Sequence, residues 1–362
     1  MKKTLLSFLL ITILVITKAQ APANYYDAAA GKTGAELKTT LYNIIKGHNV
    51  KSYDYIWTAF QTTDKKPNGK VWDMYSDIPG SAPPYEYTMI SGQCGNYSGE
   101  ASCYNREHSF PKSWFGDVAP MNCDIFHIYA TDGYVNGKRS NYPYGTVSSP
   151  SWTSLNGSKL GPCSAPGYTG IVFEPIDEYK GDLARTYFYM VTRYENVVVS
   201  WNSFADAQPT LNGTTFPCFD QWILNVLLAW NAADPVSAKE IARNNAVYAI
   251  QNNRNPYIDH PEYVNTVWGS NVGITQKQVQ VALQVYPNPV SGSCTFVLPS
   301  EYKQQNNGFA VYSSTGTPVF APISVSGDRA ILNLESLPAG FYLVRLSLNN
   351  YHTIYQARII KN

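Results

Sequence analysis

The sequence predicts an α+β domain followed by a small all-β module. Residues 20–272 combine several stretches of helical apolar spacing with loop-rich segments and short extended ones. Residues 285–362 instead contain short alternating stretches separated by turn residues at roughly ten-residue intervals, which is typical of a small β-sandwich. A polar stretch at residues 273–284 separates the two parts and is interpreted as a linker.

The first 19 residues have the three parts of an export signal peptide. Lysines at positions 2 and 3 precede an apolar run at residues 5–16, and residues 17–19 form a small-x-small cleavage site. The apolar run is too short to span a bilayer, and no later stretch approaches ~20 apolar residues. We therefore expect an exported protein without a transmembrane segment.

Four segments of the α+β domain are expected to be helical. In the first, Leu37, Leu41 and Ile44 recur with the spacing of an amphipathic helix. The other three helices are expected at residues 181–194, 219–230 and 235–253. The remaining apolar segments are expected as core at residues 54–60, as a strand or short buried element at 71–75, and as an extended segment at 171–177.

Six cysteines follow the signal peptide, which in an exported protein favours disulfides over a zinc site. No CxxC motif is present, and this also argues against structural zinc. Connectivity cannot be read from the sequence, so other pairings stay open. The pairings we expect are Cys94 with Cys103 and Cys123 with Cys163, with Cys294 unpaired.

The charge balance argues against tight binding of a polyanion. Without the signal's three lysines, 24 basic residues face 26 acidic ones, and residues 20–285 hold 19 against 23. Proteins that bind nucleic acid by neutralising phosphates are normally basic. Any nucleic-acid chemistry must therefore depend on a local groove and a bound cation, with weak and transient substrate binding.

Residues 104–145 contain the side chains best suited to catalysis. Glu107 and His108 precede by about thirty residues the polar cluster Asn136-Gly137-Lys138-Arg139-Ser140-Asn141. Imidazole titrates near neutral pH, so His108 is the candidate base that activates water. The oxygens of Glu107 and Asn136 suit Mg²⁺, a hard cation that keeps most of its waters, and Mn²⁺ or Ca²⁺ would also fit. Adjacent strand residues point to opposite faces, so the backbone must bend for both Glu107 and His108 to serve one site.

If residues 125–136 form a helix, Asn136 lies on the same face as Ile125, Ile128 and Asp132. On such a helix His127 lies nearly opposite Asn136, so we expect His127 to be structural or to act behind the metal ligands. Gly137 would end the helix, as glycine commonly does. Lys138 and Arg139 would then project from the helix end toward phosphates or solvent.

Several ordered motifs resemble the endonuclease I family of secreted or periplasmic nucleases. They are NREHSFPKSW at residues 105–114, Asp124, GYVNGKRSNY at 133–142, ARTYFYM at 184–190 and NRNPY at 253–257. The resemblance covers roughly residues 35–265 and implies a His-Me finger (ββα-metal) nuclease domain. It also implies that His108 activates water, that Glu107 and Asn136 hold one Mg²⁺, and that the products carry 5′ phosphates.

The sequence departs from this family pattern at two places. Phe126 stands where members commonly have a histidine, and the connection between the two halves is shorter than in members with a basic insertion. The arginine that assists phosphate chemistry is therefore unassigned. The candidates for catalytic charge are Arg106 and Arg139, and those for substrate binding are Lys138, Asn141 and Arg185. Arg185 could equally pair with an internal acid, and both interpretations stay open.

The β module resembles the type A sorting domain of the type IX secretion system. The matching pieces are YPNPV at residues 286–290, VYSSTG at 311–316, LPAGFYLV at 337–344 and IIKN at 359–362. The resemblance implies export across the outer membrane by that machinery, with the protein released or held at the cell surface. The alternative is a β-sandwich for adhesion or carbohydrate binding.

The sequence therefore predicts a secreted, monomeric, Mg²⁺-dependent endonuclease that acts on DNA, with RNA as a further candidate substrate. Low sequence specificity is expected because no helix-turn-helix, zinc finger or basic recognition element is present. The alternative from another class is a catalytically inactive surface protein that binds nucleic acid or glycan. A metalloprotease is disfavoured because the sequence has no HExxH motif.

Overall fold

A computed structural model describes residues 21–95, 97–269, 279–299, 302, 308–315, 317–347 and 353–362. These residues fall into two compact units that divide at residue 272. The predicted signal peptide lies outside the described residues. Within the described part of the chain, no helix combines the length and apolar character needed to cross a membrane.

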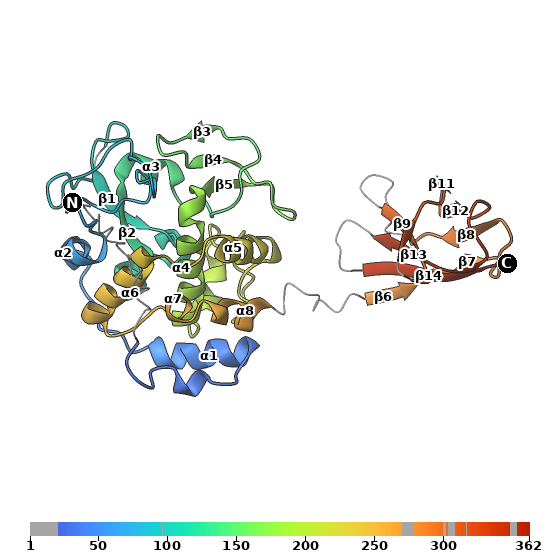
Figure 1. Ribbon diagram of the computed structural model, residues 1–362, viewed down its shortest axis with the longest axis horizontal. Helices are drawn as coiled ribbons and strands as arrows, with labels where there is room; N and C mark the ends of the chain where they lie inside the picture. Colours follow the sequence, from blue (N-terminus) through green and yellow to red (C-terminus); the bar gives the residue numbers. More distant parts are fainter. Residues whose placement is uncertain are drawn as a thin grey trace, which may run out of the picture. The chain divides into compact units, whose positions relative to one another are not determined.

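Helices are the main regular structure of the first unit, and α4 runs through its middle beside α5 (Figure 1). Every residue of α4 from 181 to 193 is buried. The four helices expected from apolar spacing are confirmed as α1, α4, α5 and α6, with ends shifted by a few residues. Among the described residues the helices are α1 (Gly34–Ile45), α2 (Tyr55–Thr63), α3 (Gly133–Arg139), α4 (Lys180–Arg193), α5 (Gln221–Ala233), α6 (Ala238–Gln251), α7 (Pro256–Asp259) and α8 (Glu262–Trp268).

Two small antiparallel sheets complete the first unit, which confirms the α+β class. In one sheet, β1 (Tyr104–His108) pairs with β2 (Ile128–Asp132), and Glu107 lies opposite Tyr129. The other has the order β3 (Trp152–Thr153), β4 (Lys159–Pro162) and β5 (Ile171–Glu174). Residues 71–75 are largely buried but belong to no named strand, so they are the short buried element of the two alternatives.

The helix considered for residues 125–136 is not formed. Residues 125–127 make one 3-10 turn, residues 128–132 make β2, and α3 begins at Gly133. A run rich in Ile, Tyr and Thr also suits a strand, and pairing with β1 decides between the two. Asp132 then caps α3, because its carboxylate accepts a hydrogen bond of 2.8 Å from the Val135 N–H. Gly137 lies inside α3 and does not end it.

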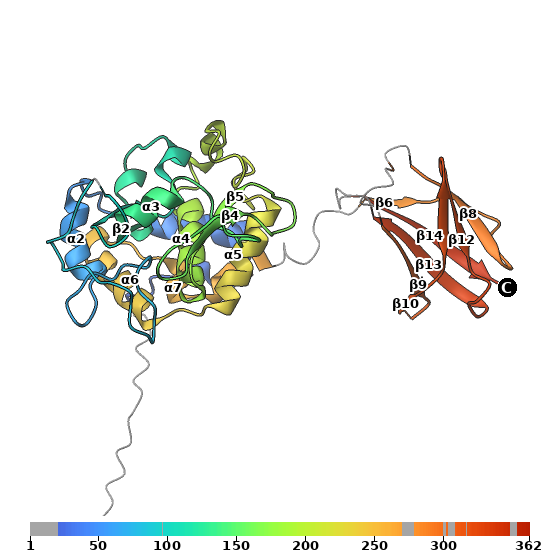
Figure 2. The same ribbon diagram turned by 90° about the horizontal axis from the view of Figure 1, so that it is seen from above.

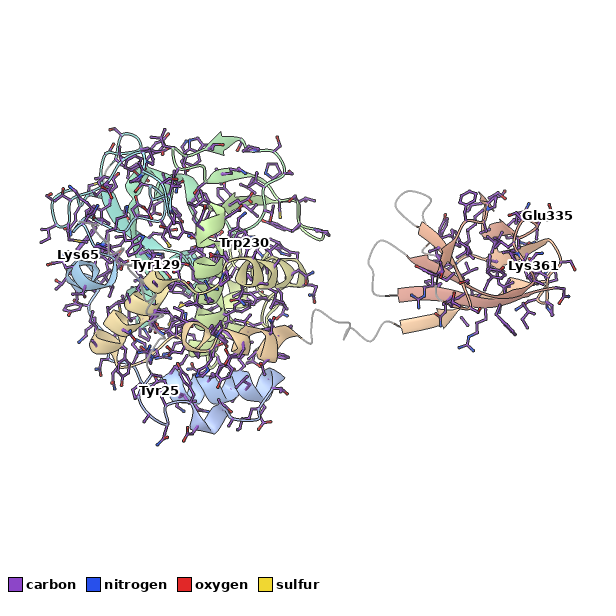
Figure 3. All side chains as sticks on the ribbon, viewed as in Figure 1. Tyr25, Lys65, Tyr129, Trp230, Glu335 and Lys361 are labelled. Atoms are coloured by element: carbon purple, nitrogen blue, oxygen red, sulfur yellow. A yellow bond between two sulfur atoms is a disulfide. The ribbon has the colours of Figure 1, made fainter. Side chains whose placement is uncertain are left out.

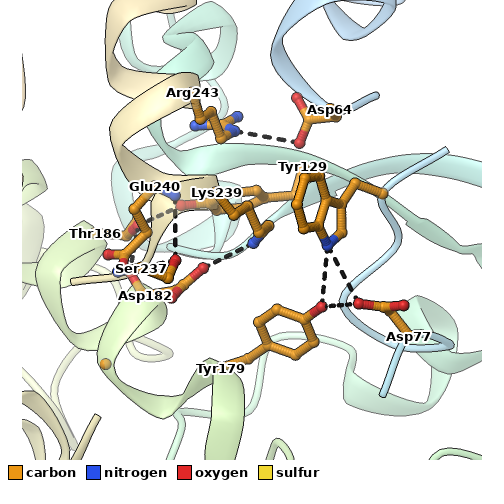
Figure 4. A network of polar contacts seen from close by, with 12 residues as sticks. Asp64, Asp77, Tyr129, Tyr179, Asp182, Thr186, Ser237, Lys239, Glu240 and Arg243 are labelled. Atoms are coloured by element: carbon orange, nitrogen blue, oxygen red, sulfur yellow. Dashed lines mark hydrogen bonds and ion pairs between the residues drawn. The ribbon is translucent and has the colours of Figure 1, made fainter. Parts of the chain in front are cut away.

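The interior of the first unit contains charged pairs as well as aromatic rings. Tyr129 of β2 is buried in this interior (Figure 3), and the Arg243 guanidinium lies 4.1 Å from its ring centroid. Arg243 Nε also lies 3.2 Å from Asp64 Oδ1, and Lys239 Nζ lies 2.7 Å from Asp182 Oδ2 (Figure 4). These two ion pairs connect α6 to the end of α2 and to α4. The charges of the four side chains are therefore paired although they are buried.

The cysteines form fewer bridges than expected. The disulfide between Cys94 and Cys103 is confirmed. The pairing of Cys123 with Cys163 is wrong, because both are buried and free, while Cys294 is free as expected. These three cysteines are therefore buried side chains that take part in no disulfide.

The second unit is all-β and consists of two sheets (Figure 2). The five-stranded sheet has the order β10-β9-β13-β14-β6, and the four-stranded sheet has the order β11-β12-β8-β7. Side chains of both sheets, such as Phe296 and Val344, share one apolar core, which confirms a sandwich. The strands are β6 (Val279–Ala282), β7 (Val285–Tyr286), β8 (Ser293–Val297), β9 (Gly308–Ser313), β10 (Pro318–Val319), β11 (Ile323–Ser326), β12 (Arg329–Asn333), β13 (Gly340–Ser347) and β14 (Thr353–Lys361).

The sandwich begins earlier than the sequence suggested. Residues 279–282, expected in the linker, form β6 and pair in parallel with β14. Their alternation of Val with Gln and Ala suits an edge strand, although their polarity resembles that of a linker.

Candidate active site

The hairpin of β1 and β2 presents alternate β1 side chains to two different neighbours. Asn105 and Glu107 contact α3 through Asn136 and Arg139. Arg106 and His108 contact the ring of Tyr53 instead. This alternation is the ordinary consequence of strand geometry. Glu107 and His108, although adjacent, therefore have separate surroundings, and the pairing of β1 with β2 continues through both residues.

Glu107 is only 2% exposed, and two donors approach the same oxygen of its carboxylate. The Tyr75 hydroxyl donates to Oε1 over 2.9 Å, and Arg139 Nη1 lies 3.1 Å from Oε1. Burial raises the pKa of Glu107, while the positive charge of Arg139 and the hydrogen bond from Tyr75 oppose that rise. A carboxylate held in this way is positioned and has little room to rotate.

Asn136 connects α3 to β1 through a single side-chain contact. Its Nδ2 donates to Asn105 Oδ1 over 3.0 Å, which turns its own Oδ1 away from Asn105. Asn136 is half-buried. Its amide oxygen is therefore oriented by Asn105, a residue that lies two positions before Glu107 on the same face of β1.

His108 has the arrangement expected of a neutral base. Its Nε2 lies 3.1 Å from the carbonyl oxygen of Asn122. A carbonyl can only accept a hydrogen bond, so Nε2 carries the proton and Nδ1 keeps its lone pair. Burial, and then the neighbouring His127, lower the pKa of His108 to about 3. The imidazole is consequently uncharged at neutral pH.

Two rings hold the imidazole of His108 in place. The Tyr53 ring stacks on it at a centroid distance of 5.6 Å and an interplanar angle of 26°. The fully buried His127 ring lies 5.4 Å away, and its Nε2 contacts the carbonyl oxygen of Met121 at 2.6 Å. The helix that would have placed His127 opposite Asn136 does not exist, so His127 instead packs against the candidate base.

Arg139 does not project toward solvent, and that expectation is wrong. The residue is 1% exposed. Its guanidinium donates to the carbonyl oxygen of His108 over 2.9 Å, to that of Ser109, and to the Tyr187 hydroxyl over 3.3 Å. The side chain points inward because α3 continues through Gly137 to Arg139. Arg139 therefore fixes the end of β1 and has no free face for a phosphate.

Arg185 is also unsuited to bind substrate. It is fully buried, and its Nε and Nη2 donate to Glu240 over 2.6 and 2.8 Å. Of the two interpretations of Arg185, the structure supports the internal ion pair. The sequence motif around Arg185 thus reflects the packing of α4 against α6.

The other candidate residues stay closer to the surface. Arg106 lies 3.6 Å from the Tyr53 ring centroid and donates to the Tyr53 carbonyl oxygen over 2.9 Å, with 17% of its side chain exposed. Lys138 is half-buried beside the ring of Tyr134, and Asn141 donates to the Asp206 carboxylate. Arg106 and Lys138 are therefore the basic candidates that remain partly accessible.

Phe126 occupies the core. It is 1% exposed, and its ring centroid lies 4.6 Å from that of Tyr189. The neighbouring Asp124 accepts hydrogen bonds from the Tyr189 and Tyr194 hydroxyls, each over 2.9 Å. The position that departs from the family pattern is thus a packing position.

Sequence reasoning missed several residues that support the site. Tyr53, Tyr75, Asn105 and Asn122 contact the candidate catalytic groups from the positions described above. The only local signal was alternation along β1, which places Asn105 on the same face as Glu107. The other three come from loops whose approach depends on the tertiary fold.

The oxygen donors of the site suit a hard cation. They are the Glu107 carboxylate on β1 and the amide oxygen of Asn136 on α3, which Asn105 orients. Such a set matches Mg²⁺, which is bound by one or two carboxylates and retains several waters, and lacks the nitrogen and sulfur ligands typical of zinc. Within the part of the chain that the structure describes, no group of three or more His, Cys, Asp and Glu residues is placed to hold a metal ion.

Comparison with known proteins shows that this chain is similar to nucleases. Residues 33–262 match the family Endonuclease I, and residues 284–362 match the secretion system C-terminal sorting domain. An extracellular ribonuclease of Bacillus amyloliquefaciens is 37% identical over 262 residues, which cover 70% of this chain and 81% of that protein. The extracellular ribonuclease of Bacillus subtilis is 36% identical, with 67% and 78% covered.

A more distant relative is an Endonuclease-1 of Buchnera aphidicola, 27% identical over 46% of this chain and 55% of that protein. The family match spans more than half of the chain, and the sorting domain identifies a protein destined for secretion or for the cell surface. The chain therefore belongs to the endonuclease I family of nucleases and carries a C-terminal secretion sorting domain.

Proposed function

We propose that this protein is a secreted endonuclease that hydrolyses phosphodiester bonds in RNA and DNA with a divalent metal ion and low sequence specificity. The observation that carries the proposal is His108, neutral and hydrogen-bonded through Nε2 to Asn122, at the end of the strand that holds Glu107. The hairpin of β1 and β2 followed by α3 is the element order of a His-Me finger. The family membership and the names of the two Bacillus relatives support RNA as a substrate beside DNA.

In the proposed reaction, His108 Nδ1 takes a proton from a water molecule as the water oxygen attacks phosphorus. The bond from phosphorus to the 3′ oxygen breaks, and that oxygen takes a proton from solvent. The products then carry a 5′ phosphate and a 3′ hydroxyl. Glu107 and Asn136 would hold Mg²⁺, which supplies positive charge to the phosphate and to the leaving oxygen.

The remaining residues of the site orient these groups. Tyr53, Asn122 and His127 fix the imidazole, while Tyr75 and Arg139 fix the Glu107 carboxylate. Arg106 is the basic side chain beside Tyr53 that retains some exposure, and we assign to it the stabilisation of phosphate charge. Asn105 orients the amide of Asn136.

The test uses the full chain without its signal peptide. We expect degradation of plasmid DNA and of ribosomal RNA with Mg²⁺ and none with a chelator. His108→Ala should lower the rate by ~10²–10⁴-fold, the usual contribution of a general base. Tyr42→Phe, on the outer part of α1, serves as the control and should leave the rate unchanged.

Intact nucleic acid after incubation with the unaltered protein and Mg²⁺ would refute the enzyme. If nucleic acid is bound but not cut, the protein is a surface binder. Undiminished cutting by His108→Ala would remove His108 from the role of base.

A further inference from the structure

The disulfide loop of the first unit holds an aromatic ring against the helix that carries Asn136. The loop is closed by Cys94 and Cys103, and Tyr97 lies between them. A methyl group added at Gly133 would come within 2.9 Å of Tyr97 Cδ1, and one at Gly137 would collide with the phenol end of the same ring. The two glycines thus form a flat strip on α3 against which the ring of Tyr97 lies.

Tyr97 is the first of three rings in contact along the outside of the unit. Its ring centroid lies 6.0 Å from that of Tyr134, which in turn lies 6.4 Å from that of Trp152. We call these three residues the aromatic row. Tyr97 is 39% exposed, and the other two are half-buried. Lys138 Nζ lies 5.2 Å from the centroid of the middle ring and adds a positive charge.

The aromatic row begins next to the metal ligand that we propose. Residues of an α-helix are separated by 100° around the axis, so Asn136 falls between Arg139 on one side and the glycine strip on the other. Arg139 contacts Glu107, and the glycine strip contacts Tyr97. Tyr75, which contacts Glu107, is fully buried, whereas Tyr97 is 39% exposed beside α3, so a strand whose phosphate reaches Asn136 can meet the ring of Tyr97.

A shallow hollow adjoins the row on the side of the disulfide. Its volume is about 550 Å³, and its lining includes Tyr97, Gln93, Ser98 and Ser102. The amide and hydroxyl groups of these side chains can donate and accept hydrogen bonds. The hollow thus combines an aromatic face with polar groups, as a site for a base and its sugar requires.

We propose that the aromatic row binds unpaired bases, so that the protein prefers single-stranded nucleic acid. The proposal rests on the proposed function and names its substrate class. Base stacking on aromatic side chains contributes about 1–3 kcal/mol per base, whereas bases in a duplex already stack on one another. Residues 20–285 hold fewer basic than acidic residues, 19 against 23, so stacking supplies affinity that charge does not.

The first experiment measures binding, in the presence of a chelator, of three fluorescent oligonucleotides of equal length: a single strand, its duplex, and an abasic strand that keeps the phosphates. We expect the unaltered protein to bind the single strand at least ~5-fold more tightly than either of the others. Tyr97→Ala and Trp152→Ala should each weaken binding of the single strand by ~5-fold or more and leave the abasic strand unaffected. Tyr97→Phe keeps the ring and should retain the affinity.

Equal affinity of the unaltered protein for all three oligonucleotides would overturn the proposal. An equal loss on the normal and abasic strands would also overturn it, since the ring would then only hold up α3. Cleavage is measured separately with Mg²⁺. If the protein binds the single strand selectively but cleaves no substrate, only the proposed enzymatic activity is refuted. If Tyr97→Ala and Trp152→Ala cleave every substrate as fast as the unaltered protein, only the proposed role of the aromatic row is refuted.

The disulfide allows a second test, because Cys94–Cys103 is the one disulfide among the six cysteines, all of which are described. A reductant therefore acts on this loop alone. Reduction should weaken binding of the single strand, and the double variant Cys94→Ser with Cys103→Ser should bind as weakly as the reduced protein and ignore the reductant. Unchanged binding after reduction would show that the loop is not needed to place Tyr97.

Discussion

Of the buried arginine–carboxylate pairs in the first unit, two differ in how the carboxylate is used. Arg185 contacts both oxygens of Glu240, at 2.6 and 2.8 Å, and the N–H of Ser237 donates to Glu240 as well. Arg139 Nη1 lies 3.1 Å from Oε1 of Glu107, while the guanidinium directs hydrogen bonds to the carbonyl oxygens of His108 and Ser109. A pair in which the arginine binds both carboxylate oxygens, here called a two-point pair, occupies the whole carboxylate. A pair with contact at one oxygen, here called a one-point pair, orients a carboxylate that can still bind a cation.

This difference separates a pair that maintains the fold from a pair that serves the site. Removing one partner of a saturated buried pair leaves an uncompensated charge. Changing the carboxylate of the one-point pair instead removes charge where the metal ion would bind. A substitution in the Arg185–Glu240 pair should therefore lower stability and leave activity unchanged. A substitution of Glu107 should instead lower activity more than stability.

The largest effect is expected from Arg185→Met. It leaves Glu240 buried without its partner, which should cost about 3–5 kcal/mol of unfolding free energy. Urea unfolding measures this loss, and the activity per folded molecule should stay unchanged. Lys32→Met removes the exposed pair with Glu36 and is the control, with an expected cost below ~1 kcal/mol. Equal costs for the two variants would contradict the structural role of Arg185.

A smaller effect in free energy, but a clear one in rate, is expected from Glu107→Gln. The amide oxygen can still accept from Tyr75, and Arg139 keeps its hydrogen bonds to the carbonyl oxygens of His108 and Ser109, so the loss of unfolding free energy should be smaller than for Arg185→Met. Loss of the anionic oxygen should lower kcat by at least ~100-fold. Glu36→Gln is the control, because that carboxylate is 71% exposed and pairs with Lys32 on the surface. Initial rates at several Mg²⁺ concentrations make the measurement. A Glu107→Gln enzyme as fast as the parent would show that the one-point pair serves only the fold.

The smallest effect is expected from Lys138→Ala, the half-buried neighbour of fully buried Arg139 on α3. It should raise KM a few-fold and reduce the dependence of log KM on log salt by about one unit, as expected for one phosphate contact. The melting temperature should not change. Lys46→Ala on the distant surface of α1 should alter neither quantity. A stability loss without a change in the salt dependence would place Lys138 with Arg139 among the residues that maintain the fold.

The sequence predicted what depends on local pattern. The helices α1, α4, α5 and α6 have long apolar faces, and the strands of the sandwich alternate between clear turns, so each could be located. Residues 125–136 could not, because their apolar spacing suits either a helix or a strand and the choice depends on pairing with β1. The disulfide between Cys94 and Cys103 was predictable from their short separation in the sequence. Cys123 and Cys163 are free, and their spacing in the sequence did not reveal this.

The candidate site was predicted in part for the same reason. The motifs identified Glu107, His108 and Asn136, and the hairpin with α3 carries all three. They could not tell whether a basic residue faces solvent or the core. Arg139 and Arg185 are buried by partners 32 and 55 positions away in the sequence, and such contacts leave no local signal.

The short helix α3 has a consequence for how the site is assembled. It has seven residues, two of them glycine, and isolated helices shorter than ~12–15 residues are marginal in water. Its order therefore comes from its neighbours: the Asp132 cap, the Arg139 anchor and the ring of Tyr97. Amide hydrogen exchange over residues 133–139 would thus measure the free energy of assembling the site itself, separately from the stability of the surrounding unit.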